Sequence, residues 1–208
     1  MSAPQQFREF WNDRYREEGF AYGAEPNDFV RAQTHLIPPG RVLCLAEGQG
    51  RNAVHLAKLG YAVTAVDLSP IGLQKAQELA AEHGVSIETQ AVDLAEFQIE
   101  PDVWQGIVSI FAHVSPPIRN RIHGQVATGL APGGIFILEA YTPHQLEAKG
   151  VGGPGREHVD KLMSLVDLRK ELVGLTFLHA QELEREVVEG RFHSGVSAVV
   201  QVVARREA

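Results

Sequence analysis

The chain has 208 residues, a formal net charge of −7 and a single cysteine. This length predicts one domain with a substantial core. No apolar run approaches the roughly 18 residues of a membrane span, and the first residues carry no apolar signal core. We therefore expect a cytoplasmic protein without a membrane partner. The acidic balance, with no basic run before Arg205, argues against nucleic acid as a partner.

Aromatic residues mark one face of the first expected helix, residues 4–18. They are spaced by three, one and four positions: Phe7, Phe10, Trp11 and Tyr15. This spacing is typical of an apolar stripe on a helix. Asn27 is expected to cap a second helix, residues 28–36, which the following prolines end. We expect residues 1–37 to be an appendage to a sheet. Two alternatives stay open: the appendage is a lid over the strand ends, or its stripe is permanent core packing.

Expected strands and helices alternate between residues 42 and 141. The strands are 42–45, 61–66, 86–92, 104–111 and 135–141, and the helices between them are 51–59, 70–83 and 116–130. Strict alternation requires parallel strands with helices on both faces of the sheet. The single cysteine, Cys44, lies in the first strand, where a buried side chain is expected.

The last third of the chain departs from this alternation. Residues 142–158 are rich in glycine and proline and predict a mobile loop, and residues 159–173 predict a helix. Two long strands follow, 176–188 and 194–205, and their short connection requires an antiparallel pair. The sequence therefore predicts an α/β, Rossmann-like, doubly wound sheet of seven mostly parallel strands. An antiparallel C-terminal hairpin closes this single domain, whose ligand-binding core is residues 40–208.

A glycine turn follows the first strand. Glu47-Gly48-Gln49-Gly50 links that strand to a helix that Arg51 and Asn52 open. Strand, glycine turn and helix are how an open parallel sheet holds a nucleotide-like ligand at its carboxyl edge. An ordinary strand–helix connection with two glycines is the alternative, because a lone glycine motif is a weak signal.

Two classes of ligand compete for such a sheet, dinucleotides and S-adenosylmethionine. Both would use the glycine turn and Asp67, which ends the second strand where ribose hydroxyls need an acceptor. Three features favour the methyl donor. Glu47 would repel a pyrophosphate but attract an ammonium or sulfonium group. Asp93 ends the third strand, in a place suited to an adenine amino group, and the C-terminal hairpin is foreign to dehydrogenase sheets.

Five segments carry a resemblance to a known family over nearly the whole chain: residues 22–29, 48–54, 65–69, 93–94 and 109–113. The chain resembles class I S-adenosylmethionine-dependent methyltransferases, specifically the branch with tellurite-resistance and thiopurine methyltransferases. The resemblance implies that the glycine loop holds the methionine part of the donor, that Asp67 takes the ribose and that Asp93 faces adenine.

The chain also departs from the family pattern. Cys44 and Ala46 replace the acid and the first glycine of the commoner Asp-Leu-Gly-Cys-Gly loop, and Glu47 restores a carboxylate nearby. Tellurite-acting members carry a late His-Arg pair, for which the nearest match here is Glu184-Arg185. This difference argues against an oxyanion substrate and leaves methyl transfer intact.

The expected donor-binding residues are Trp11, Arg14, Tyr15, Tyr22, Glu47, Gly48, Gly50, Arg51, Asn52, Asp67, Leu68, Asp93, Leu94 and Ser109. His113 follows the fourth strand beside the expected methyl position and is the candidate base, although a capping or packing role suits it equally. Tyr141 is a second catalytic candidate. No metal is expected, because the remaining histidines form no ligand set.

Methyl transfer from a sulfonium mainly requires in-line placement of donor and acceptor, while a hydroxyl or amine acceptor also requires a base. We therefore expect a methyltransferase for a small molecule, with a soft sulfur, selenium or tellurium nucleophile, acting as a monomer or homodimer. Two alternatives remain open: a non-catalytic S-adenosylmethionine-binding protein and an NAD-dependent dehydrogenase.

Overall fold

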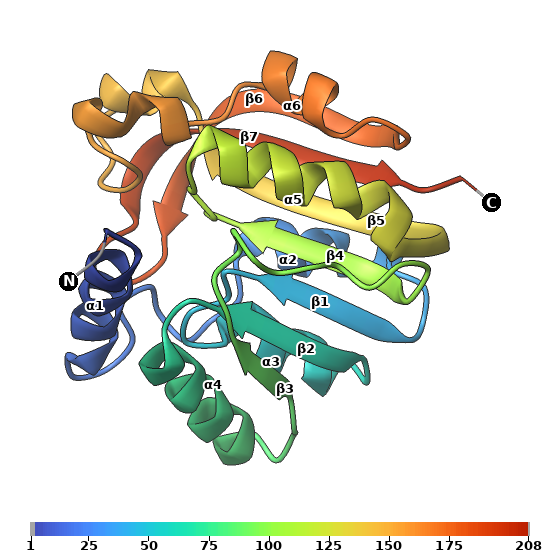
Figure 1. Ribbon diagram of the computed structural model, residues 1–208. Helices are drawn as coiled ribbons and strands as arrows, with labels where there is room; N and C mark the ends of the chain where they lie inside the picture. The colour runs from blue at the N-terminus through green and yellow to red at the C-terminus, as the bar shows by residue number, and fades with distance from the viewer. Residues whose placement is uncertain (1–2, 208) are drawn as a thin grey trace.

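The computed structural model describes residues 3–207 as one seven-stranded sheet with helices on both faces (Figure 1). The strands are β1 (Arg41–Leu45), β2 (Ala62–Asp67), β3 (Glu88–Ala91), β4 (Trp104–Ile110), β5 (Leu130–Tyr141), β6 (Thr176–Val188) and β7 (Ser194–Arg205). The α-helices are α1 (Ala3–Arg16), α2 (Asp28–Gln33), α3 (Arg51–Lys58), α4 (Pro70–Glu82), α5 (Pro116–Gly129) and α6 (Leu165–Glu171). Three 3-10 helices complete the set: η1 (Thr34–Leu36), η2 (Pro143–Leu146) and η3 (Arg156–Lys161).

The strand order is β3-β2-β1-β4-β5-β7-β6. Strands β1 to β5 pair in parallel, and β7 runs antiparallel to both β5 and β6. The predicted doubly wound sheet with an antiparallel C-terminal hairpin is therefore confirmed. The order reverses direction between β1 and β4. In open α/β sheets, ligands bind at the carboxyl ends of the strands at such a switch point.

Alternate residues of β1 enter the two core layers. Leu43 and Leu45 pack with side chains of α5 and α6. Val42 and Cys44 pack with side chains of α2 and α3 on the other face. All four are at most 1% exposed, because successive side chains of a strand point to opposite faces. The buried, free Cys44 agrees with its predicted packing role.

The appendage before β1 divides into two parts. Helix α2 belongs to the core, since Phe29 and Val30 pack against β1. Helix α1 stands apart from the sheet, at the left of Figure 1, and its closest helical neighbour is α4. Asn27 accepts a hydrogen bond from Val30 N at 3.0 Å and caps α2, as predicted. Within this appendage, only α1 and the loop after it lie where they can cover the strand ends.

The predicted helix over residues 159–173 is wrong. The structure has η3 and α6 there, separated by an extended Leu162. Ser164 accepts a hydrogen bond from Asp167 N at 3.1 Å and so starts a new helix. Leu162 and Met163 are buried, and Met163 N donates to Tyr141 O, so tertiary packing breaks the helical periodicity.

Three smaller differences concern the remaining boundaries. Strand β3 is shorter than the predicted 86–92, and β5 starts at Leu130 instead of residue 135. The loop predicted over 142–158 contains η2 and a bridge between Val151 and Ser194. Within residues 3–207, no helix is long and apolar enough to cross a lipid bilayer.

Candidate active site

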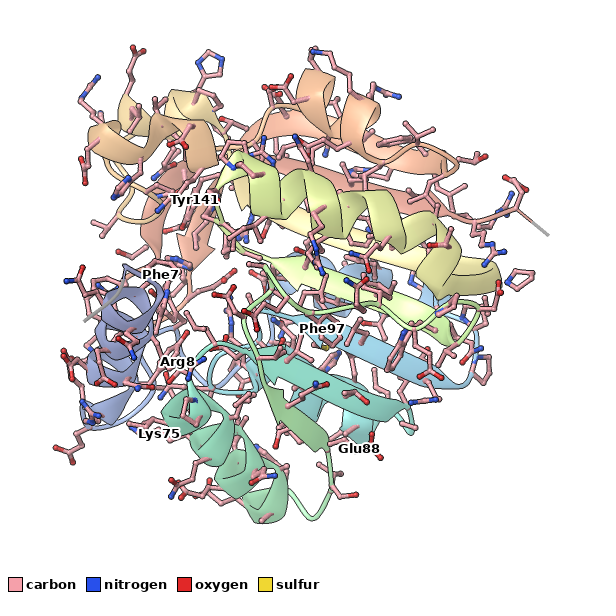
Figure 2. All side chains as sticks on the ribbon, in the orientation of Figure 1. Phe7, Arg8, Lys75, Glu88, Phe97 and Tyr141 are labelled. Carbon is pink, nitrogen blue, oxygen red and sulfur yellow. The ribbon has the colours of Figure 1, made fainter. Side chains whose placement is uncertain are left out.

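A cavity of about 890 Å³ lies over the carboxyl ends of β1, β2 and β4. Its walls come from α1, the glycine turn, the loop after β3, residues 110–118, residues 153–161 and the turn between β6 and β7. Phe7 lies at the N-terminal end of α1, on the side toward the sheet (Figure 2). The sequence places these segments as much as 187 positions apart, from Gln6 to His193, and the fold brings them to one site.

Most of the predicted site residues line this cavity. They are Trp11, Arg14, Tyr15, Tyr22, Glu47, Gly48, Arg51, Asn52, Asp67, Leu68, Asp93, Leu94 and His113. We call the wall formed by the glycine turn and the ends of β2 and β3 the donor half. The wall formed by α1, residues 110–118, residues 153–161 and His193 of the β6–β7 turn is the acceptor half.

Glu47 joins the donor half to α3. Its Oε1 accepts hydrogen bonds from Asn52 N and Ala53 N, both at 2.8 Å, so it satisfies amides of the first helical turn. Burial raises the pKa of Glu47 to about 7, against the opposing effect of these amides and of Arg51. The carboxyl group thus has a structural role besides the predicted attraction of a positive charge.

Asp67 is likewise held by the backbone. Its Oδ2 accepts from Gly48 N and its Oδ1 accepts from Ser69 N, each at 2.8 Å. Burial raises the pKa of Asp67 to about 6. A carboxylate has about four acceptor sites, so capacity remains for ribose hydroxyls. Asp67 therefore fixes the glycine turn and can also receive a ligand.

Asp93 closes the donor half beyond β3. Its Oδ1 accepts from Ala95 N at 2.8 Å, which forms a tight turn at the strand end. Arg121 of α5 donates to Leu94 O at 3.0 Å and to Phe97 O at 2.7 Å. The turn that carries Asp93 is therefore fixed from the helix side of the sheet.

Arg51 combines an ion pair with an unsatisfied donor. Its Nη2 lies 2.6 Å from Glu189 Oε2, and the whole residue is 7% exposed. Its Nη1 is buried without a hydrogen-bond partner among the described residues. An orphaned buried donor costs free energy, on the order of 1–3 kcal/mol, unless a ligand or water satisfies it. Because Arg51 lines the cavity, this nitrogen is a candidate contact for an anionic ligand group.

Helix α1 lies directly on the glycine turn. Trp11 and Tyr15 stack with ring centroids 5.7 Å apart. A Cβ atom added to Gly48 would lie 2.6 Å from the Tyr15 hydroxyl, so the ring sits closely over this residue. The Ser69 hydroxyl donates to Asn12 Oδ1 at 2.6 Å, which ties the helix to the end of β2.

His113 lines the cavity, but the backbone occupies both of its ring nitrogens. Tyr141 N donates to Nε2 at 3.2 Å, which leaves Nδ1 to donate to Lys161 O at 3.0 Å. Burial lowers the pKa of His113 to about 4. The predicted general-base role therefore requires a correction, because no ring nitrogen is free to take a proton. The packing role considered beside it agrees with this geometry.

Three other predicted site residues do not line the cavity. Tyr141 is fully buried, with its ring stacked on Phe111 at 4.5 Å, so it cannot reach a substrate. Ser109 is buried inside β4. Gly50 has φ +88°, and an added Cβ would lie 2.5 Å from Ala76 Cβ, so it serves the contact between α3 and α4.

Sequence reasoning missed several residues of the acceptor half. His193, in the β6–β7 turn, is 8% exposed and packs 4.5 Å from Tyr22 and 4.6 Å from Phe111. Burial holds the pKa of His193 well below its usual value. Lys161 and the cavity-facing placement of Phe10 were also missed. The sequence signals for this half were the aromatic stripe of α1 and the segment that ends at His113.

Two non-glycine residues with positive φ lie in the cavity wall, Ala46 at 50° and Phe111 at 52°. Ala46 stands where the commoner family loop has glycine. Each left-handed residue costs on the order of 1–2 kcal/mol. Such strain at the ends of β1 and β4 is typical of functional sites.

Comparisons with known proteins agree with this geometry. The family model of the methyltransferase domain matches residues 42–134. Ribosomal protein L11 methyltransferase of Symbiobacterium thermophilum is 31% identical over 124 residues, 57% of this chain and 38% of that protein. An uncharacterized protein of Mycobacterium bovis is 28% identical over 107 residues, 51% of this chain and 39% of that protein. The chain thus spans less than half the length of these curated relatives.

Solved structures extend the similarity to nearly the whole chain. One is a protein studied for the conversion of a disulfide bond into a thioacetal group during echinomycin biosynthesis, with a TM-score of 0.73 and 20% identity over 97% of this chain and 93% of that one. Another is TehB from Haemophilus influenzae, with a TM-score of 0.68 and 22% identity over 96% of this chain and 67% of that one. At these identities the similarity shows the fold.

Residues 42–134 therefore match a methyltransferase domain, and the chain has the fold of class I S-adenosylmethionine-dependent methyltransferases. The predicted Rossmann-like fold is confirmed, and the family match supports the predicted enzyme class and S-adenosylmethionine as its cofactor. The tellurite-resistance and thiopurine branch stays a prediction.

Proposed function

We propose that the chain transfers a methyl group from S-adenosylmethionine to a soft nucleophile on a small molecule. The observation that carries this proposal is one continuous cavity, in which the donor half and an aromatic acceptor half meet at the ends of β1 and β4. A protein that only senses the donor has no need of a second, open half. The acidic net charge of −7 favours a small-molecule acceptor over nucleic acid, and a cytoplasmic location remains our proposal.

The residues of the donor half fit S-adenosylmethionine. The buried, unpartnered Arg51 Nη1 would hold the carboxylate of the donor. Asp67 retains acceptor capacity for ribose hydroxyls, and Asp93 lies at the next strand end for the adenine amino group. When bound, the donor supplies a methyl group activated by its sulfonium.

Two histidines of the cavity wall, His113 and His193, support a soft acceptor. Both His113 and His193 have lowered pKa values because of burial, so both are neutral, weak bases near pH 7. A hydroxyl or amine acceptor depends on a base for roughly 10²–10⁴-fold of its rate. A sulfur, selenium or tellurium nucleophile depends mainly on alignment with the donor, which the packed walls can supply.

Relatives of the same fold act on different nucleophiles. The echinomycin protein, studied for the conversion of a disulfide bond into a thioacetal group, supports a sulfur acceptor, whereas NodS of Bradyrhizobium japonicum, with a TM-score of 0.66 and 14% identity, is an N-methyltransferase. The fold therefore does not determine which atom accepts the methyl group. In this chain the neutral His113 and His193 favour a soft nucleophile.

We propose further that α1 is a lid that excludes water from the site. Its Trp11 and Tyr15 lie on the glycine turn, and Gly19 and Gly23, both with positive φ, flank the loop that would hinge. A lid predicts slower amide hydrogen exchange over residues 7–16 when the donor is added. Exchange that ignores the donor would show that the stripe is permanent core.

The test of the function is turnover of a panel of thiols, selenite, tellurite and amines, scored by release of S-adenosylhomocysteine. We expect release with at least one chalcogen acceptor and little with amines. Donor binding without release for any acceptor would favour a non-catalytic binding protein. Release with amines alone would contradict the soft nucleophile.

A further inference from the structure

We propose that the methyl acceptor is an organic anion: an apolar body that lies against Phe7 and Phe10, with an acidic group held between Lys161 and Arg14. This inference rests on the proposed function and specifies the substrate class of the same site. It predicts which molecules the acceptor half selects, and it separates an organic acid from a bare chalcogen oxyanion.

The cavity is large for a single ligand. Sites for one drug-sized ligand range from roughly 300 to 1,000 Å³. At about 890 Å³ this cavity lies near the upper end of that range, so it offers room for an acceptor beside the donor. A tellurite or selenite ion has four non-hydrogen atoms and would leave most of this space empty. The space beside the donor is therefore large enough for an organic molecule.

The wall of this remaining space is aromatic. Phe7 is 38% exposed and Phe10 is 49% exposed, and both line the cavity from α1. They pack edge-on against Trp11, with ring centroids 6.2 and 5.4 Å away. Large apolar side chains exposed inside a cavity indicate an apolar partner. Phe111 continues the aromatic wall from the end of β4.

Two cations of the acceptor half lie over these rings. The Lys161 ammonium is 5.4 Å from the Phe7 ring centroid, and the Arg14 guanidinium is 5.0 Å from that of Phe10. Arg14 donates to the Tyr22 hydroxyl at 3.0 Å. A molecule stacked on either phenylalanine therefore places its substituents close to a positive charge.

Neither cation has an acidic partner. Among residues 3–207, no ion pair within 4.0 Å involves Lys161 or Arg14. Arg51, by contrast, pairs with Glu189 at 2.6 Å. Among the cavity-lining residues of the acceptor half the one acid is Glu157, which is exposed on η3 and forms no such pair either. The local balance of the acceptor half is therefore positive.

The overall charge of −7 does not oppose this assignment. Charges more than about 8 Å apart are largely screened at physiological ionic strength, so the nearest groups decide which ligand is held. The other acids of the cavity, Glu47, Asp67 and Asp93, lie in the donor half. An anionic acceptor would thus meet the two unpaired cations, and a cationic acceptor would be repelled by them.

The test compares acceptors that differ only in charge. The probes are 4-mercaptobenzoate, an anion, and 4-mercaptobenzamide, its neutral isostere. The variant Lys161→Met keeps an apolar stem over Phe7 and removes the charge. Lys149→Met is the matched control, because Lys149 is exposed and does not line the cavity.

In the wild type we expect kcat/KM for the benzoate to exceed that for the benzamide by at least tenfold. Lys161→Met should reduce this ratio roughly tenfold, because one attraction between opposite charges, partly screened by solvent, is lost. Lys149→Met should leave the ratio unchanged. Added salt should lower the ratio in the wild type and in Lys149→Met, and much less in Lys161→Met. A wild-type preference for the amide, or a ratio that Lys161→Met does not change, would overturn the proposal.

A binding measurement separates this outcome from failure of the proposed function. Calorimetric titration of 4-methylbenzoate and 4-methylbenzamide into the complex with S-adenosylhomocysteine requires no turnover. Tighter binding of the benzoate, lost in Lys161→Met, supports the acceptor class even if neither thiol reacts. Equal binding of both probes contradicts the acceptor class while S-adenosylhomocysteine binding still supports the donor site.

Discussion

The two halves of the cavity are built in different ways. The donor half comes from residues 46–95, where each site carboxyl group lies at or near a strand end and accepts hydrogen bonds from backbone amides. The acceptor half comes from segments far apart in the chain, and it carries exposed phenylalanines and unpaired cations. Local geometry therefore determines the donor half, and tertiary packing determines the acceptor half. We infer that the first fixes the cofactor and the second fixes the specificity.

Removal of the Asp67 carboxylate should have the largest effect on ligand binding, and this effect should be confined to the donor half. Asp67→Ala leaves Gly48 N and Ser69 N without their acceptor and removes the ribose contact. We expect a loss of about 1–3 kcal/mol in donor binding and a comparable loss in the free energy of unfolding. Calorimetry with S-adenosylhomocysteine and thermal denaturation measure the two losses.

The control for this variant is Asp13→Ala, an exposed acid of α1 outside the cavity. It should change neither quantity. Donor binding by Asp67→Ala that equals the wild type would show that Asp67 is purely structural and would break the assignment of the donor half.

Substitution of Gly48 should lower donor affinity about tenfold through steric exclusion. Gly48→Ala places a Cβ 2.6 Å from the Tyr15 hydroxyl at φ +62°, whereas Gly60→Ala meets nothing within 4 Å at φ +92°. Both variants should lose about 1 kcal/mol of stability, because both leave a non-glycine residue at positive φ. Only Gly48→Ala should weaken donor binding in calorimetry. Equal donor affinity in the two variants would contradict the close approach at Gly48.

Donor affinity should rise several-fold between pH 5 and pH 8. Burial raises the pKa of Asp67 from 3.8 to about 6 and that of Glu47 from 4.5 to about 7. The stability that these protonated groups contribute is present below about pH 4 and is lost as the pH rises through 6 to 7. The positive charges of the donor favour the ionised forms, so binding should strengthen over the same range.

Titrations of S-adenosylmethionine at several pH values, with the melting temperature of the free protein alongside, check this dependence. Affinity that is flat or falls across pH 5–8 would show that neither carboxyl group faces the positive charges of the donor.

Truncation of Phe10 should have the smallest effect and should be confined to the acceptor half. Phe10 is 49% exposed, so Phe10→Ala should change stability by less than about 1 kcal/mol. KM for an aromatic acceptor should rise about threefold, since part of an apolar contact is lost. Leu59→Ala is the matched control, since Leu59 is 56% exposed and lies outside the cavity. An unchanged KM in Phe10→Ala would remove Phe10 from the acceptor wall.

The difference between the halves also explains what the sequence could predict. Strand, glycine turn and helix are local patterns, so Glu47, Gly48 and Asp67 could be placed from their neighbours in sequence. The parallel sheet and the C-terminal hairpin followed from connection lengths alone. The cap of α4 is equally local, since Ser69 accepts a hydrogen bond from Gly72 N at the start of the helix.

The errors arose where long-range packing decides. His113 was expected to act as a base, but two backbone groups that are distant in sequence occupy its ring. His193 lies 182 positions after Trp11 in the same wall, and no local pattern joins them. The broken helix at Leu162 depends on burial against Tyr141, which periodicity does not encode. The residues of the acceptor half can therefore be identified only from the tertiary structure.

Calorimetric titration of the intact chain with S-adenosylmethionine and, separately, with NADH tests the central claim most directly. The donor half, with three carboxyl groups at or near successive strand ends and an unpartnered Arg51 Nη1, predicts one molecule of S-adenosylmethionine bound at micromolar or tighter affinity. It predicts no heat from NADH, whose pyrophosphate Glu47 would repel. Binding of NADH with no response to S-adenosylmethionine would contradict the account.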